Sequence, residues 1–250
     1  MRKLRDRVPS LQSEDFLRLA MEARSPAAAG ELAKQGLLRQ ADGPQSDPEG
    51  AVLLLREVFK AHLHARRSRS AHAIARKMIR LAALPEVTHA DLGRACASLT
   101  WWTRAAQAYR LAARFAPARR RALHWGACAS ALHHAGRSEE SLAALDRAVR
   151  WSTGTRPLHR AYAALVRLDR GDEVEDLDAI ESDLELARCG EGYGRYVLGL
   201  IAVARGDRPR GRKFLREFLK RNVGDPLREA TLAAEIARAR KTLRSSRVSR

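Results

Sequence analysis

The chain has 250 residues and a formal net charge of +18, and three residue types, 45 Ala, 40 Arg and 33 Leu, make up almost half of it. The β-branched residues that favour strands are scarce, with 11 Val, 5 Ile and 7 Thr, whereas strong helix formers dominate. This composition argues against a β protein and predicts an all-α fold.

Apolar residues recur three and four positions apart in segments that short Gly, Pro, Ser or Asp breaks separate. The pattern predicts helices over residues 13–24, 27–40, 49–65, 69–83, 88–99, 102–116, 119–135, 138–151, 157–169, 173–187, 191–205, 208–221 and 226–243. Gly136, Gly171 and Gly206 each fall between two of these helices and are 35 residues apart. Because a helix pair of that length cannot bury its apolar face alone, the spacing predicts a solenoid of stacked helical hairpins.

Two segments carry the residues of a known repeat. The first has Leu92-Gly93, Ala105, Tyr109, Ala112 and Pro117, and the second has Leu198-Gly199, Gly211, Leu215 and Phe218. The pattern resembles the tetratricopeptide repeat, with a Leu-Gly pair in the first helix, small and aromatic residues in the second, and a closing proline. The resemblance covers residues 86–222. It implies a right-handed superhelix of antiparallel helical hairpins that serves as a non-enzymatic, protein-binding scaffold or adaptor.

The periodicity and the resemblance together divide the chain into four regions. We expect an N-terminal helical cap over residues 1–48, a repeat array over 49–222, a C-terminal capping helix over 223–243 and a disordered basic tail over 244–250. The predicted first helix of each hairpin lines the concave surface in the family that the array resembles.

That concave surface is the predicted partner groove. Transfer of the family's groove-facing positions to this chain gives His133, His134, Tyr162, Leu165, Tyr193, Tyr196 and Leu200. An aromatic and aliphatic surface suits an amphipathic helix or an extended peptide, with tyrosines as rigid anchors. The alternative is that Tyr193 and Tyr196 pack between repeats as part of the core.

A second candidate surface is an arginine ridge, in which four members recur four residues apart and again at a 34-residue offset, and two more lie in the following loop. It comprises Arg76, Arg80, Arg110, Arg114, Arg120 and Arg121. Arginines bind phosphate bidentately, so the ridge and the basic C-terminal tail form an alternative nucleic-acid or anion-binding site. The other interpretation is a solvated outer face, because no aromatic residues interleave with the ridge and an Arg excess also fits the codon bias of a bacterial genome.

An acidic helix and a basic helix are offset by the repeat pitch. Adding 35 residues to Glu173, Glu175, Asp178, Glu181 and Glu185 gives Arg208, Arg210, Lys213, Arg216 and Lys220. We therefore expect ion pairs between neighbouring repeats at these positions. The alternative is that the basic stripe binds nucleic acid or lipid headgroups.

The sequence gives no sign of an enzyme. None of the eight histidines forms an H-x-x-x-H or H-E-x-x-H pair, and the three cysteines are odd in number and widely spaced, so we expect no metal, no cofactor and no disulfide framework. No small-molecule substrate is evident. The longest apolar run, residues 197–204, is too short to span a bilayer, and no apolar segment follows the basic N-terminus. We expect a cytoplasmic protein.

Overall fold

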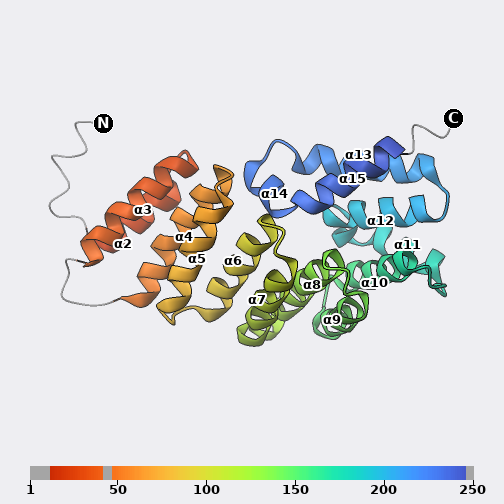
Figure 1. The fold of residues 1–250 in the computed structure, drawn as a ribbon, viewed down its shortest axis with the longest axis horizontal. Coiled ribbons are helices and arrows are strands. Elements are labelled where there is room, and N and C mark those ends of the chain that lie inside the picture. Colours follow the sequence, from red (N-terminus) through yellow and green to blue (C-terminus); the bar gives the residue numbers. More distant parts are fainter. Residues whose placement is uncertain (1–11, 42–46, 246–250) are drawn as a thin grey trace.

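The computed structural model describes residues 12–41 and 47–245, and Figure 1 shows them as an elongated row of helices. The helices are α2 Ser13–Glu22, α3 Pro26–Ala41, α4 Pro48–His64, α5 Ser68–Arg80, α6 Pro85–Ser98, α7 Trp102–Phe115, α8 Ala118–His134, α9 Ser138–Trp151, α10 Arg156–Arg170, α11 Leu177–Leu186, α12 Tyr193–Ala204, α13 Arg208–Asn222, α14 Pro226–Thr231 and α15 Ala233–Ser245. A short 3-10 helix, η2 (Arg188–Gly190), precedes α12. No strand occurs in the described residues, so the all-α prediction is confirmed for them.

Consecutive helices pack against one another along the row, from α2 to α13. This arrangement confirms an array in which each helix contacts its neighbours in sequence. The predicted helices all have counterparts, but the one predicted over residues 173–187 begins only at Leu177, and the last one is divided. The predicted helix over residues 226–243 is interrupted at Leu232, whose backbone leaves the helical region, so that two helices, α14 and α15, replace it. Of the predicted basic tail, Arg244 and Ser245 belong to α15, and residues 246–250 lie outside the described part of the chain.

The turns inside the hairpins have left-handed backbone conformations. Gly136, Gly171 and Gly206 follow α8, α10 and α12 with φ of 74°, 85° and 86°. Glycine adopts this conformation without a steric penalty, which explains why glycine recurs there. The equivalent turns after α4 and α6 instead contain Arg66 and Thr100, with φ of 57° and 59°. The two N-terminal turns are therefore strained.

We expect Thr100→Gly to raise the free energy of unfolding by about 1 kcal/mol, because glycine removes the clash of a β-branched residue in this region. Gly136→Ala is the matched control at an equivalent turn. A Cβ atom at Gly136 would meet no atom within 4 Å, so its effect is purely conformational and should be a loss of about the same size. Urea unfolding of both variants measures these changes. A loss of stability in Thr100→Gly would show that the threonine side chain outweighs the strain.

Small residues let the two helices of a hairpin approach closely. A Cβ atom at Gly93 would lie 2.7 Å from ring atoms of Tyr109, and one at Gly199 would lie 2.7 Å from Leu215 Cγ. Alanines such as Ala105 and Ala112 are fully buried in the same interfaces. Close packing between α6 and α7 is therefore present at Gly93 and Tyr109.

The acidic helix pairs with basic residues in a different register from the predicted one. Glu181, which is 2% exposed, lies 2.5 Å from Arg205 and 3.4 Å from Arg210, and Glu185 lies 2.6 Å from Arg210. The 35-residue register is therefore wrong. Its cause is local, because residues 172–176 are not helical and α11 begins at Leu177, which leaves Glu173 and Glu175 outside the helix.

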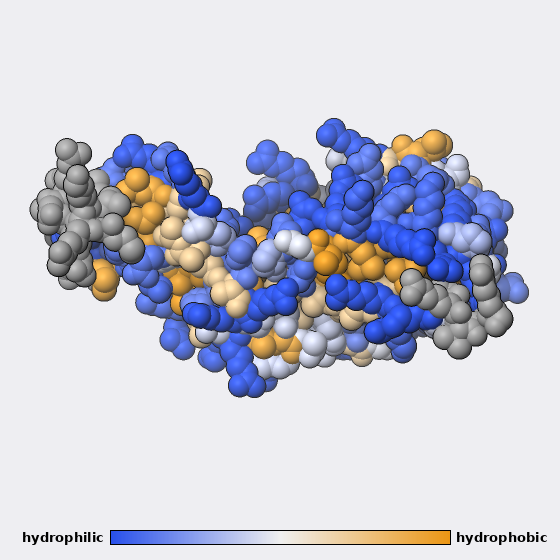
Figure 2. All heavy atoms as spheres, turned by 90° about the horizontal axis from the view of Figure 1, so that it is seen from above, coloured by the Kyte–Doolittle hydropathy of each residue, from blue (hydrophilic) through white to orange (hydrophobic). Residues whose placement is uncertain are grey.

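The last two helices do not extend the row but run back along it. Figure 1 shows α14 and α15, in dark blue, above the middle of the array. Seen from above, the surface is largely hydrophilic, with apolar patches between the charged side chains (Figure 2). We call residues 226–245 the strap. No helix in the described residues is both long and apolar enough to cross a membrane.

Candidate protein-binding groove

The strap lies on the face that the first helices of five successive hairpins form. These helices are α4, α6, α8, α10 and α12, and we call their common surface the inner face. Within the strap, α14 contacts α4 and α6, and α15 contacts α12 and also α13. Side chains of α15 reach α8 and α10 as well. The strap therefore crosses all five first helices, on the surface that the sequence predicts as the partner groove.

Glu235 of α15 is the first polar anchor of the strap, and it is only 6% exposed. Its Oε1 accepts hydrogen bonds from Ser130 Oγ at 3.0 Å and from Tyr193 Oη at 3.2 Å. His134 Nε2 lies 3.5 Å from the same oxygen, which is within ion-pair distance and at the outer limit of a hydrogen bond. Burial alone would raise the pKa of Glu235, but contact with His134 and the bond from Ser130 outweigh burial and lower it. The carboxylate is therefore ionised at neutral pH.

Arg238, one turn further along α15, is the second anchor. Its guanidinium donates to both carboxylate oxygens of Asp169 on α10, at 2.7 and 2.6 Å. His133 Nε2 lies 3.0 Å from the same carboxylate. Burial raises the pKa of Asp169, and the hydrogen bonds from His133 and Arg238 reverse this effect, so that the pKa lies below its usual value. Two oppositely charged anchors thus fix the strap on the inner face.

The seven predicted groove residues divide into two groups. His133, His134 and Tyr193 are partly exposed and lie next to the two anchors. The other four, Tyr162, Leu165, Tyr196 and Leu200, are at most 5% exposed. Tyr196 packs against Phe218 of α13 with ring centroids 5.2 Å apart, so it belongs to the packing between helices.

Aromatic rings form a continuous series along the inner face. Trp102 contacts His134 with ring centroids 4.8 Å apart. His133, Tyr162 and Tyr193 continue the series at centroid distances of 5.7 and 6.0 Å. Burial raises the pKa of Tyr162 and Tyr193, which keeps both hydroxyls protonated as hydrogen-bond donors. The series gives the groove a rigid floor with polar atoms at fixed positions.

A cavity of about 480 Å³ remains between the strap and the inner face. It follows α8 from Leu123 to Ser130, two positions about 10 Å apart along the helix. Its walls are mainly small or apolar, with Ala127 and Leu158 among them. Leu123 is 64% exposed, so the cavity opens to solvent there, whereas Glu235 bounds it near Ser130.

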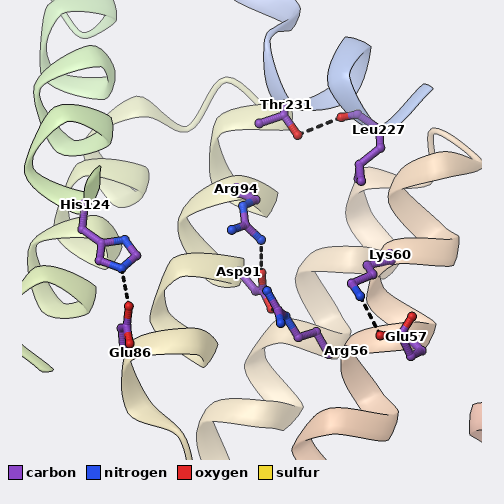
Figure 3. A network of polar contacts seen from close by, with 9 residues as sticks. All are labelled: Arg56, Glu57, Lys60, Glu86, Asp91, Arg94, His124, Leu227 and Thr231. Carbon is purple, nitrogen blue, oxygen red and sulfur yellow. Dashed lines mark hydrogen bonds and ion pairs between the residues drawn. The ribbon is translucent and has the colours of Figure 1, made fainter. Parts of the chain in front are cut away.

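A buried histidine and a partly exposed arginine supply polar groups to the cavity wall. Burial lowers the pKa of His159 to about 4, so its ring is neutral at pH 7. Its Nε2 lies 3.3 Å from Thr155 Oγ1. Arg94 lines the cavity and forms an ion pair with the buried carboxylate of Asp91. The same carboxylate accepts a hydrogen bond from Arg56 at 2.9 Å (Figure 3). A mostly apolar cavity with a few fixed polar groups is typical of a binding site.

Three arginines of the ridge form ion pairs or aromatic contacts within the fold. Arg110 lies 3.8 Å from Glu140, and Arg120 lies 2.7 Å from Glu86. Glu86 also contacts His124 at 2.7 Å, as Figure 3 shows, so this carboxylate ties α6 to α8. Arg121 stacks over Trp151, 4.4 Å from the ring centroid. In the described part of the chain no carboxylate lies within ion-pair distance of the exposed Arg76, Arg80 and Arg114.

Histidines and cysteines do not gather into a metal site in the described residues, where no group of three or more His, Cys, Asp or Glu side chains could hold an ion. Cys96, Cys128 and Cys189 are free thiols. Ser130 and His134 both contact the carboxylate of Glu235.

Sequence reasoning did not find the strap residues Glu235 and Arg238. One signal for Glu235 was available, because it lies beside Ile236 and one turn before Ala239, on the apolar side of its helix. A charged residue at such a position is rarely buried without a partner. The partners, however, lie between 42 and 105 residues earlier in the chain, and periodicity alone does not identify them. Comparison with protein-family models and with curated proteins finds no match to this chain.

Proposed function

We propose that this protein is a non-enzymatic scaffold of tetratricopeptide-like repeats, wound as a right-handed superhelix, which binds a protein or peptide segment on its inner face. The observation that carries this proposal is the position of the strap on the inner face. A helix of this chain occupies the inner face through charged anchors, which indicates that the surface can accept a helical segment. The open cavity beside the strap offers further apolar contact area. Free thiols at all three cysteines fit a cytoplasmic location.

The test is to fill the cavity and compare partner capture. Ala127 lines the cavity on α8, and an arginine at this position would occupy it. Ala143→Arg on the exposed side of α9 is the matched control for added size and charge. We expect tagged full-length protein to capture a partner from nuclease-treated native extract. Ala127→Arg should reduce this capture at least about tenfold, whereas Ala143→Arg should leave it unchanged.

Equal capture by both variants and by the unmodified chain would contradict a site on the inner face. Circular dichroism and thermal unfolding of each variant establish that the fold is intact before capture is compared.

The second candidate function is binding of nucleic acid or another polyanion on the arginine ridge. It is favoured by the exposed Arg76, Arg80 and Arg114, which lack carboxylate partners in the described residues. Its signature is DNA or RNA binding that weakens steeply between about 50 and 200 mM salt and is lost in the double variant Arg80→Glu, Arg114→Glu. The inner-face partner should tolerate both the salt and this double variant.

A further inference from the structure

The strap is attached more weakly than the helices beneath it. In α14 no residue is buried, and in α15 only Glu235, Ile236 and Ala239 are buried. In α12, by contrast, eight of the 12 residues are buried. Segments with few buried apolar contacts open at lower free energy than the core of the same protein. Local opening of the strap is therefore expected before the array unfolds.

The strap is attached through two charged side chains, each of which has hydrogen-bond partners on the inner face. Glu235 meets Ser130 and Tyr193, and Arg238 meets Asp169. When the strap leaves, the partly buried Asp169 carboxylate loses its guanidinium. A replacement segment that supplies the same two charges at the same spacing would restore these contacts, because a buried charge without its partner is costly.

We propose that the strap is an intramolecular occupant of the inner face and that the partner segment displaces it. The partner is then an amphipathic helix with a glutamate and, three residues later, an arginine, and with small or aliphatic residues at the positions of Ile236 and Ala239. This inference rests on the proposed function, which it deepens by giving the chemistry of the partner. The protein is autoinhibited until a helix of that kind competes with residues 226–245.

The experiment uses the full chain and a fluorescently labelled synthetic peptide of residues 226–245. Arg238→Ala in the chain weakens the strap and leaves the inner face intact, whereas Asp169→Ala weakens the strap and removes an anchor site for the peptide. Arg240→Ala, on the exposed side of α15, is the matched control. Fluorescence anisotropy gives the affinity of the peptide for each chain. Hydrogen exchange measured by mass spectrometry gives the opening of α15 relative to α12.

We expect α15 to exchange faster than α12 in the unmodified chain and faster still in Arg238→Ala. The peptide should bind Arg238→Ala at least about tenfold more tightly than the unmodified chain, because the apparent affinity is reduced by the fraction of molecules whose site is already occupied. Arg240→Ala should behave like the unmodified chain. Asp169→Ala should show fast exchange in α15 without the gain in peptide affinity.

Three results would overturn the inference. The first is exchange in α15 as slow as in α12, with no peptide binding to Arg238→Ala, which would make the strap a permanent part of the core. The second is equal peptide binding to Arg238→Ala and Asp169→Ala, which would show that the anchors are not recognised. The third is a partner that binds while exchange in α15 stays unchanged. This last result contradicts displacement but leaves the proposed function intact. Peptide binding as expected, without any partner capture that depends on Ala127, would instead contradict the proposed function and leave only the displaceable strap.

Discussion

Asp91→Ala is expected to lower the free energy of unfolding by about 3 kcal/mol. The Asp91 side chain is completely buried on α6 and accepts hydrogen bonds from Arg56 on α4 and from Arg94 on its own helix. Removal of the carboxylate leaves both guanidinium groups without their partner. Because each arginine side chain keeps about a third of its surface exposed, water can solvate them in part, so the cost should lie at the lower end of the range for broken buried ion pairs.

Asp91 also positions a group in the binding cavity, since Arg94 is part of the cavity wall. Its loss should therefore change partner binding as well as stability. Glu31→Ala is the control, because the ion pair of Glu31 with Lys34 lies on the surface with both side chains more than half exposed. Such pairs contribute about 0–1 kcal/mol. Urea unfolding followed by circular dichroism measures both variants, and similar losses in the two would contradict a structural role for the buried carboxylate.

The second large effect concerns the dependence of stability on pH. Burial lowers the pKa of His159 from 6.5 to about 4 in the folded protein. Between these values the unfolded chain binds a proton that the folded chain does not bind, so stability rises with pH across this interval. The contribution of His159 is complete above pH 6.5 and decreases as the pH falls to 4. Its total is about 3 kcal/mol, from 1.36 kcal/mol for each unit of pKa difference.

His159→Gln should therefore flatten the stability profile between pH 6.5 and 4, while Leu158→Ala should lower stability by the same amount at every pH. The flattening is partial, because burial also lowers the pKa of His62, His72 and His89. Urea unfolding at half-unit steps of pH measures the profiles. Parallel profiles for the unmodified chain and His159→Gln would show that His159 titrates normally in the folded protein.

Local patterns in the sequence predicted the helices well because their causes are local. Asp47 and Asp225 cap helices that begin with proline, as their side chains accept bonds from backbone N–H groups of the first turn. The periodic glycines mark turns that require a left-handed backbone. Gly93 is explained by the neighbouring helix, because the ring of Tyr109 leaves no room for a side chain there.

Pairings between distant segments were not predictable in the same way. The 35-residue pitch suggested that Glu181 pairs with Arg216, but a non-helical segment before α11 changes the register, and Glu181 pairs with Arg205 and Arg210. Tyr196 has the spacing of a groove residue, yet its ring packs on Phe218. The first difference arises because repeat equivalence assumes helices of equal length and start, whereas the packing of Tyr196 follows the alternative that the sequence left open.

The sequence by itself therefore determined that the chain is helical, where most helices begin and end, and that neighbouring helices pack in order. Only the tertiary structure decided that residues 226–245 lie across the inner face and that Glu235 meets Ser130, 105 residues earlier in the chain. The reason is physical. Helix formation and turn geometry depend on neighbours within a few residues, whereas the path of the strap depends on the shape of five stacked hairpins and on charges that only the assembled surface brings together.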